Sequence, residues 1–533
     1  MGFNNLVLPI QTITTTRTKL SKINKDKEDI VRWILKFAGR RKKILFLIST
    51  LVFIRLLYLW KGEDGQKVEV PPSVPYNGIT NKEQISNIHN NLSYVRKSVK
   101  AYRPRPPPYF RGYKLPQDHP CNRFTLPPPP ADKKRTGPRP CPVCYLPLEE
   151  AIGLMPSSPS FSPVLKNLTY IHEEPLNRKT EFGGSDFGGY PTLKQRKRSF
   201  NIKSSMSVHC GFVKGREPGR GTGFDIDETD LREMKRCRGI VVASTVFDAF
   251  DDVKSPSNIS KYSEQTVCFL MFVDEKTESS LKKDKGFNRT TKKVGLWRVV
   301  VVHNLPYTDG RRNGKVPKLL VHRLFPNSRY SLWIDGKLDL VVDPHQILER
   351  FLWRENVTFA ISRHYKRFDV FVEAEANKAA GKYANSSIDF QVNFYKKEGL
   401  TPYSSAKLPI TSDVPEGCVI LREHVPISNL FTCLWFNEVD RFTSRDQISF
   451  STVRDNIAAR TKWNVNMFMD CERRNFVVQR YHRVDQEKLK KKQSPMAIIS
   501  PPALISSDLP RKLSKVSPVV SITPPRMRGR DKQ

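Results

Sequence analysis

The sequence predicts an α/β fold in which helices cover both faces of a mainly parallel sheet. Between residues 200 and 483, short β-branched runs alternate with stretches of helical periodicity. These runs are apolar at successive positions, which is typical of strands that are buried on both faces. Two of them end in an aspartate, Asp274 and Asp335. Ligands bind such sheets outside the carboxyl ends of the strands, so both carboxylates are candidates for function.

The elements of this sheet follow one another in regular order. Five strands are predicted, at 206–213, 239–247, 266–274, 296–305 and 329–335. A helix is expected over 309–326, because Leu319, Leu320 and Leu324 recur at helical spacing with Lys and Arg between them. It leads into the last strand, so right-handed crossovers are expected.

A membrane anchor is predicted ahead of this domain, at residues 44–60. This mostly apolar run follows the basic cluster at 40–43, and its length is at the short end of a membrane span. The positive flank predicts a type II signal-anchor, with residues 1–43 as a cytoplasmic basic tail and the rest in the lumen. Arg55 lies inside the run and would cost about 2.5–3.5 kcal/mol on insertion unless it reaches the interface. The alternatives are a buried core helix and, less well matched, a cleaved signal peptide.

Two segments outside the domain have the composition of unfolded chain. Residues 61–150 are rich in proline, which favours extended polyproline geometry, and they are predicted to form a luminal stalk. Residues 488–533 are predicted to be a disordered basic tail. Much of the net charge of +37 lies outside the domain. Residues 1–43, for example, hold 11 Lys or Arg against 3 Asp or Glu. A nucleic-acid-binding protein fits poorly, because its basic segments would lie on both sides of a membrane.

Cysteines and glycosylation sequons agree with a luminal domain. Most of the nine cysteines would pair there, with at least one left over. The CPVC motif at 141–144 could be half of a zinc site, but no second CxxC exists, so a disulfide or an unpaired structural role is favoured. Six N-x-[ST] sequons follow the anchor, at Asn91, Asn167, Asn258, Asn288, Asn356 and Asn385.

The stretch SLWIDGKLDL, residues 331–340, is the strongest candidate for a functional site. An apolar strand ends in Asp335, turns on a glycine, and is followed by Lys337 and Asp339. The stretch is either a turn with solvated charges or the edge of a site for a phosphate or a metal.

Several long motifs resemble known families. The segment KVPKLLVHRLFPNSRYSLWIDGKLDLVVDPHQIL resembles the part of GT-A glycosyltransferases in which a helix and a strand present an acidic D-x-D motif. The motifs ISRHYKRFDVFVEAEAN, KLPITSDVPEGCVILREHVP, LFTCLWFNEVDRFTSRDQISF and MDCERRNFVVQRYH resemble the plant family labelled domain of unknown function 616. That family includes a mucilage-related hexosyltransferase and a turgor-regulation protein described as an alkaline ceramidase. The resemblance covers about residues 200–483 and implies a GT-A-like catalytic domain.

The resemblance implies a UDP-sugar donor and a Mn²⁺ ion held by Asp335, Asp339 and His482. The sequence departs from D-x-D, because Lys337 stands where the second acid belongs and would repel a cation. Two arrangements remain open. Either Asp335 and Asp339 share the metal through a widened turn, or Lys337 itself neutralises the diphosphate and the metal is dispensable.

The resemblance also implies residues for catalysis and acceptor binding between 435 and 450. An inverting transfer needs a carboxylate that accepts the proton of the acceptor hydroxyl, and the candidates are Asp446, Glu438 and Asp440. Trp435 and Gln447 are candidates for contact with the acceptor. The alternative for this stretch is a helix cap with surface ion pairs, and core packing for the tryptophan.

Further donors to the nucleotide-sugar are expected near the other strand ends. His364, Lys366 and Arg367 concentrate positive charge that suits phosphates, although a solvated basic loop is equally consistent with them. Asp274 could bind a ribose hydroxyl.

The leading hypothesis is a single-pass type II Golgi hexosyltransferase that acts on a cell-wall polysaccharide or glycan, with other Golgi glycosyltransferases as candidate partners. One alternative is a ceramidase-type lipid amide hydrolase, although neither a G-x-S-x-G nor an H-E-x-x-H motif occurs. The other is a non-catalytic scaffold for glycosyltransferases.

Overall fold

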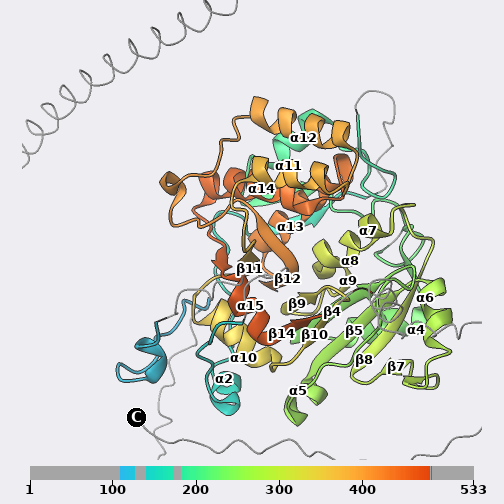
Figure 1. Cartoon of the computed structure of the whole chain (residues 1–533), viewed down its shortest axis with the longest axis vertical. Coiled ribbons are helices and arrows are strands. Elements are labelled where there is room, and N and C mark those ends of the chain that lie inside the picture. Colours follow the sequence, from blue (N-terminus) through green and yellow to red (C-terminus); the bar gives the residue numbers. More distant parts are fainter. Residues whose placement is uncertain (1–107, 126–139, 173–181, 216, 481, 483–533) are drawn as a thin grey trace, which may run out of the picture. The chain divides into compact units, whose positions relative to one another are not determined.

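The computed structural model describes residues 108–125, 140–172, 182–215, 217–480 and 482 (Figure 1). These residues belong to one compact unit of the chain. The predicted anchor at 44–60 and the predicted tails at 1–43 and 488–533 lie outside the described residues. Within the described ranges, no helix is both long and apolar enough to cross a membrane.

A ten-stranded mixed sheet forms the centre of the unit (Figure 1). Its strand order is β13-β11-β12-β9-β4-β5-β8-β7-β6, and β3 pairs with β8. The bounds are β3 (Asp225–Ile226), β4 (Ile240–Val246), β5 (Val267–Val273), β6 (Phe287–Asn288), β7 (Lys293–Val294), β8 (Trp297–His303), β9 (Tyr330–Ile334), β11 (Phe359–Arg363), β12 (Pro415–Glu423) and β13 (Asn466–Phe468). Two small sheets lie beside it, β1 (Asn167–Tyr170) with β2 (Ser205–Val208), and β10 (Leu338–Leu340) with β14 (Val477–Gln479).

Strand direction decides which chain segments meet at one edge of the sheet. The four central strands β8, β5, β4 and β9 are parallel. Strand β12 runs antiparallel to β9, and β11 runs antiparallel to β12. The carboxyl ends of β4, β5, β8, β9 and β11 therefore share one edge, together with the amino end of β12. The expected mixed α/β sheet is confirmed, and its parallel part is the central four strands.

The strands are buried on both faces, as their composition predicts. In β4, Val241 and Ala243 belong to one apolar cluster, whereas Ile240 and Val242 belong to the other. Helices on either side supply the partners of each cluster. The bounds of the described α-helices are α2 (Leu148–Gly153), α3 (Leu193–Ser199), α4 (Glu228–Arg236), α5 (Lys261–Thr266), α6 (Glu275–Leu281), α7 (Gly310–Asn313), α8 (Lys315–Leu319), α9 (Val321–Leu324), α10 (Pro344–Leu348), α11 (Val370–Ala379), α12 (Asn385–Lys397), α13 (Pro426–Arg441), α14 (Asp446–Thr461) and α15 (Asp470–Phe476).

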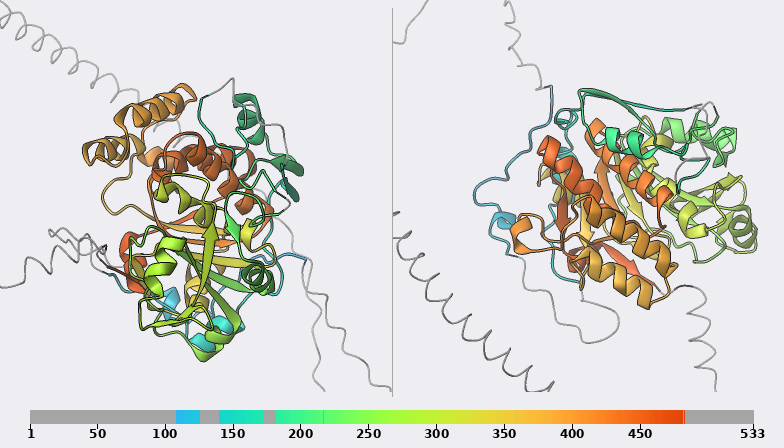
Figure 2. Two further views of the ribbon diagram at one scale, coloured as in Figure 1. Left: turned by 90° about the vertical axis from the view of Figure 1, so that its right-hand side faces the viewer. Right: turned by 90° about the horizontal axis from the view of Figure 1, so that it is seen from above.

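Figure 2 shows how the helices are distributed along the unit. The pair α11 and α12 lies at one end, and α2 and α5 lie at the other (Figure 1). The long helices α13 and α14 contact each other, α13 also contacts the helix α8, and α14 also contacts the strand β12. These contacts place α13 and α14 at the edge of the sheet where β9 ends.

Two predicted elements differ from the structure. The run at 206–213 yields only β2, which pairs with β1 outside the main sheet. The helix expected over 309–326 is divided into α7, α8 and α9. Gly314 separates the first two, and Pro317 has no amide hydrogen to extend a longer helix through α8.

The predicted stalk is shorter than residues 61–150, because part of it packs on the domain. The amide of Phe110 donates to the carbonyl of Pro159, and α2 contacts α10. Cys141 forms a disulfide with Cys471 of α15. The predicted start of the domain at residue 200 is also too late, since β1 and α3 precede it. The proline-rich composition does not predict this packing, because disulfides and isolated contacts hold the segment on the domain.

Eight of the nine cysteines form disulfides, as expected for most of them. The pairs are Cys121–Cys144, Cys141–Cys471, Cys210–Cys433 and Cys237–Cys268. Cys418 is the free, buried thiol. Both cysteines of the CPVC motif are in disulfides, which agrees with the reading favoured over a zinc site.

Five of the six predicted glycosylation sites are described, and all five side chains are exposed. They are Asn167, Asn258, Asn288, Asn356 and Asn385. Asn91 lies outside the described residues. A sequon must be accessible to be glycosylated, and these five are. Glycosylation of the asparagines stays a prediction.

Candidate functional site

Asp335 lies where the sequence places it, directly after β9 at the carboxyl edge of the sheet. Its Oδ1 accepts a hydrogen bond from Nε1 of Trp333 at 2.9 Å. A Cβ at Gly336 would meet the carbonyl oxygen of Thr245 at 2.6 Å, so the turn passes too close to β4 for any other residue. The side chain of Asp335 is 31% exposed and can contact a ligand.

Asp446 opens α14 and is almost fully buried. Its backbone carbonyl accepts a hydrogen bond from Nε1 of Trp435 in α13, at 2.8 Å. The carboxylates of Asp335 and Asp446 thus come from a strand and a helix far apart in sequence. A buried tryptophan donates to the carboxylate of Asp335 and another to the backbone carbonyl of Asp446, which restricts the position of both residues.

Two lysines of α8 join these acids. Nζ of Lys315 and Nζ of Lys318 each lie 2.8 Å from Oδ2 of Asp446. Lys318 also lies 3.8 Å from Oδ1 of Asp335. Lys318 is 4% exposed, and a lysine is seldom buried unless its charge is paired.

A side chain of β12 holds the end of α8 from the other side. The buried Arg422 donates hydrogen bonds to the carbonyls of Lys318 and Leu319, at the end of α8. At the amino end of the same strand, a Cβ on Gly417 would lie 3.1 Å from Nζ of Lys318. Strand β12 can therefore approach the ammonium group of Lys318 closely, because Gly417 has no side chain.

Lys337 adds a third ammonium group. It is half-buried, and Asp335 raises its pKa against the opposing effect of burial. In the ranges that the structure describes, no carboxylate lies within ion-pair distance of its Nζ. Three lysines therefore gather around two aspartates at this edge, and Glu416 is a further charge that acts on Lys337.

The charges of the cluster shift the pKa of its members. Burial raises the pKa of Asp446, but the ammonium groups of Lys315 and Lys318 outweigh it and hold that pKa far below the usual value. Burial also opposes ionisation of Asp335, whose pKa Lys318, Lys337 and Lys315 nevertheless lower. Burial lowers the pKa of Lys315 to about 8. Both acids are therefore carboxylates at neutral pH.

The residues predicted to hold a metal do not come together. Asp339 forms an ion pair with Arg480, and Nδ1 of His482 lies 2.7 Å from Oδ1 of Asp251. Over the described residues, the one group of three potential ligand atoms within 4.8 Å of one another is Cys210, His322 and Cys433, of which the cysteines form a disulfide. The predicted set of Asp335, Asp339 and His482 is wrong for this structure, and lysines surround Asp335 where a cation would bind.

Comparison with known proteins identifies the family. The model of the TOD1/MUCI70, glycosyltransferase-like domain matches residues 168–482. The chain belongs to this family. It is 72% identical over 552 residues to the probable hexosyltransferase MUCI70 of Arabidopsis thaliana, covering 100% of this chain and 94% of that protein. The predicted family and the predicted glycosyltransferase class are thereby confirmed.

Other relatives are more distant. The alkaline ceramidase TOD1 of Arabidopsis thaliana is 37% identical over 308 residues, which cover 56% of this chain and 63% of that protein. Among solved structures, mouse xyloside xylosyltransferase 1 is 10% identical with a TM-score of 0.28, covering 43% of this chain and 85% of that one. A likeness of that size carries no argument about the site.

Two of the three predicted catalytic acids of this TOD1/MUCI70 domain have structural partners. Glu438 pairs with Arg196 at 2.6 Å and accepts a hydrogen bond from the hydroxyl of Tyr395. Asp440 accepts hydrogen bonds from Ser185 and from the hydroxyl of Tyr307. Both acids are buried, so they anchor neighbouring segments, and Asp446 is the one that lies beside Asp335.

The residues predicted to bind the acceptor are also structural. Trp435 is fully buried in the core and positions Asp446. Nε2 of Gln447 donates to the carbonyl of Pro415, which joins α14 to the start of β12. Asp274 lies at the end of β5 as predicted, but its carboxylate caps α6 through Thr277 and accepts from the amide of Asp248. Both oxygens of Asp274 therefore already accept hydrogen bonds within the fold.

The three residues predicted to bind phosphates in the basic stretch after β11 differ in their contacts. The buried His364 accepts hydrogen bonds at Nδ1 from the amides of Lys366 and Arg367, so it shapes the loop. Arg367 forms an ion pair with the buried Glu373. Lys366 is exposed at the same edge of the sheet as Asp335, and phosphate binding by it stays a prediction.

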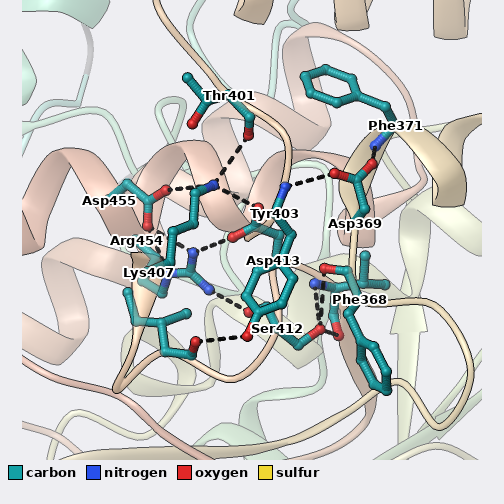
Figure 3. A network of polar contacts seen from close by, with 12 residues as sticks. Phe368, Asp369, Phe371, Thr401, Tyr403, Lys407, Ser412, Asp413, Arg454 and Asp455 are labelled. Carbon is teal, nitrogen blue, oxygen red and sulfur yellow. Dashed lines mark hydrogen bonds and ion pairs between the residues drawn. The ribbon is translucent and has the colours of Figure 1, made fainter. Parts of the chain in front are cut away.

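A network beside this stretch fixes the loop that enters β12 (Figure 3). Arg454 of α14 and Lys407 converge on the two oxygens of Asp413, at 2.6 and 2.7 Å. Asp369 receives the amide of Tyr403 at 2.6 Å while it caps α11. The network links α14, α11 and the start of β12, and thereby positions Asp446 relative to Gly417.

Sequence reasoning missed Lys315 and Lys318. The helix over 309–326 was predicted from its leucines, and no role was predicted for these two lysines. Their spacing of three residues, on a helix that leads into an acid-ended strand, was the available signal. Only the folded chain brings Asp446, 131 residues away, to that face.

Proposed function

We propose that the protein is a Golgi hexosyltransferase that transfers a hexose from a UDP-sugar to a cell-wall polysaccharide or glycan. One observation carries the proposal: Asp335 and Asp446 meet at the carboxyl edge of the sheet, joined by Lys318. That edge is where α/β sheets bind nucleotides. A carboxylate for the acceptor's proton and positive charge for a diphosphate are the two requirements of the reaction.

Each side chain then has one task. The ammonium groups stabilise the diphosphate as it leaves, and Asp446 accepts the proton of the acceptor hydroxyl. Asp335, held by Trp333, orients the donor through its exposed oxygen. Because the groups come from three rigid elements, the donor and the acceptor can be held in reacting geometry.

The relative called an alkaline ceramidase suggests a second activity. Its likeness covers 56% of this chain, against 100% for the relative called a probable hexosyltransferase. The lysine and aspartate cluster offers charge for an anionic leaving group, which amide hydrolysis does not require. The transferase is therefore the proposal, and lipid hydrolysis is an outcome that the test can reveal.

A turnover assay on the purified full-length protein tests the proposal. UDP release is followed for a panel of UDP-hexoses, with and without oligosaccharide acceptors, beside an assay of ceramide hydrolysis. We expect one donor to be turned over, and Asp446→Asn to slow turnover by about 10²- to 10⁴-fold, as for loss of a general base. Glu375→Gln, an exposed acid of α11, is the control and keeps full activity.

Ceramide hydrolysis without UDP release would contradict the proposal. Full turnover by Asp446→Asn would contradict the role of that residue.

A further inference from the structure

Three lysine ammonium groups surround the two candidate acids. Nζ of Lys315 and of Lys318 each bind Oδ2 of Asp446 at 2.8 Å. Lys318 also approaches Asp335 to 3.8 Å. Lys337 follows Asp335 by two positions, half-exposed and without an ion-pair partner among the described residues.

This arrangement does not fit a divalent cation. Two ammonium groups bind Oδ2 of Asp446 and one lies 3.8 Å from Oδ1 of Asp335, and they would repel a divalent ion at close range. The predicted partners Asp339 and His482 are bound to Arg480 and Asp251 instead. The same positive charge suits a diphosphate, since lysine binds phosphate oxygens as a point charge.

We propose that Lys315, Lys318 and Lys337 bind the donor's diphosphate in place of a metal ion, and that Lys315 and Lys318 leave Asp446 for the phosphates as the donor binds. Asp446 is thereby released to act as the proton acceptor. This inference rests on the function proposed above and gives that site its order of events: the donor binds first and activates the base.

The exchange follows from the contacts of Asp446. An oxygen that two ammonium groups hold at 2.8 Å is a poor proton acceptor, because protonation would break both ion pairs. When phosphate oxygens take over the lysines, each ammonium group exchanges one anionic partner for another. Asp446 then regains its affinity for a proton at the moment when the donor is in place.

The chemical step balances on these groups. The oxygen of the acceptor hydroxyl forms a bond to the anomeric carbon of the hexose, and its proton moves to Oδ2 of Asp446. The bond from the anomeric carbon to the diphosphate breaks, and its electron pair stays on the phosphate oxygen. The lysines stabilise that added charge.

The exchange requires the lysine side chains to move while helix α8 stays in place. Arg422 holds the end of α8 through the carbonyls of Lys318 and Leu319. The side chain of Lys315 is 15% exposed and that of Lys318 is 5% exposed. A phosphate that enters from solvent would therefore meet the half-exposed Lys337 first and the α8 lysines next.

Calorimetric titration of the full-length protein in detergent tests the lysine site. The probes are UDP and pyrophosphate, which has the diphosphate and no base, each with EDTA and with Mn²⁺. We expect the UDP Kd in EDTA to lie within about threefold of that in Mn²⁺. Lys337→Met should weaken both ligands by about tenfold or more, as for loss of a charged contact. Lys397→Met, an exposed lysine of α12, is the matched control and should bind as the unmodified protein does.

A second variant tests the release of Asp446. Asp446→Asn removes the carboxylate that competes for Lys315 and Lys318, so UDP should bind several-fold more tightly while UDP-hexose turnover falls by about 10²- to 10⁴-fold. A purely structural ion-pair network makes the opposite prediction, because the unpaired lysines would be disordered and UDP would bind more weakly. Weaker UDP binding by a folded Asp446→Asn protein overturns the exchange.

The outcomes separate this inference from the proposed function. UDP binding that requires Mn²⁺ and is unaffected by Lys337→Met overturns the inference and leaves the hexosyltransferase in place. Absence of UDP binding and turnover in a folded protein overturns both. Because Lys337 makes no ion pair in the described structure, its variant should fold even if the α8 variants do not.

Discussion

At the scale of single residues, hydrogen bonds from two tryptophans hold the acids of the site. Trp333→Phe removes the donor to Oδ1 of Asp335 and keeps most of the buried ring. We expect UDP to bind about tenfold more weakly, and the free energy of unfolding to fall by about 1–3 kcal/mol from the lost hydrogen bond and packing. Calorimetry and urea unfolding measure the two effects.

Trp297 supplies the matched control for that change. It is equally buried, and its Nε1 donates to the carbonyl of Lys254 at 2.7 Å, at the start of β8 and thus at the other edge of the sheet. Trp297→Phe should cost similar stability and leave UDP binding unchanged. Equal loss of binding in both variants would show that Trp333 acts only through the fold.

A half-buried histidine, His424, makes stability depend on pH. Burial, and then the charge of Arg422, lowers the pKa of His424 from 6.5 to about 3. The unfolded chain takes up a proton below pH 6.5 and the folded chain does not, so stability is full above that pH and falls as the pH falls toward 3. At pH 5 the loss is about 2 kcal/mol from this residue.

Urea unfolding at pH 7.5 and pH 5 measures this effect. His424→Gln, which has no proton to gain, should lose about 2 kcal/mol less between the two pH values than the unmodified protein. The exposed His172→Gln is the control and should lose as much as the unmodified protein. A drop of the same size in His424→Gln would show that the group is not responsible.

At the scale of elements, the close approach of β9 and β4 determines where Asp335 lies. A Cβ in Gly336→Ala would meet the carbonyl oxygen of Thr245 at 2.6 Å, and a backbone atom cannot turn aside. We expect a loss of about 1–3 kcal/mol of unfolding free energy, as for overpacking, and weaker UDP binding. Gly153→Ala in α2, where no atom lies within 4 Å, should change neither. Unchanged stability of Gly336→Ala would contradict the described turn.

The elements also show what the sequence could predict. Four of the five predicted strands are strands of the main sheet, because runs such as VCFLMFV in β5 can be buried only between two layers. Asp335 was found for the same reason, since the end of a parallel strand is defined locally. The α8 lysines were not found from the sequence, because their burial depends on α14 and β12, which pack against α8 only in the folded chain.

The acids between 435 and 450 illustrate the same limit. The sequence shows Glu438, Asp440 and Asp446 as equivalent candidates. Their partners Arg196, Ser185 and Lys318 come from distant segments, and only those partners separate the structural acids from the one at the site. Spacing along a helix could not make that distinction.

At the scale of the whole molecule, a disulfide fastens the segment before the domain to its far end. Cys141 and Cys471 are 330 residues apart in sequence. Replacing both by serine should lower the free energy of unfolding by about 2–4 kcal/mol and raise hydrogen exchange in residues 140–150. Replacing Cys121 and Cys144, which close a loop of 23 residues within the segment, should leave its attachment to α15 intact. Unchanged exchange in the first variant would contradict this role.

The account depends most on the position of the diphosphate. The direct measurement is an experimental structure of the full-length protein with UDP bound in the presence of EDTA. The account predicts phosphate oxygens at about 2.7–3.2 Å from Nζ of Lys337 and of the α8 lysines, with Asp446 no longer paired to both. UDP bound away from Asp335, or density for UDP only when Mn²⁺ is present and liganded by Asp335, would contradict it.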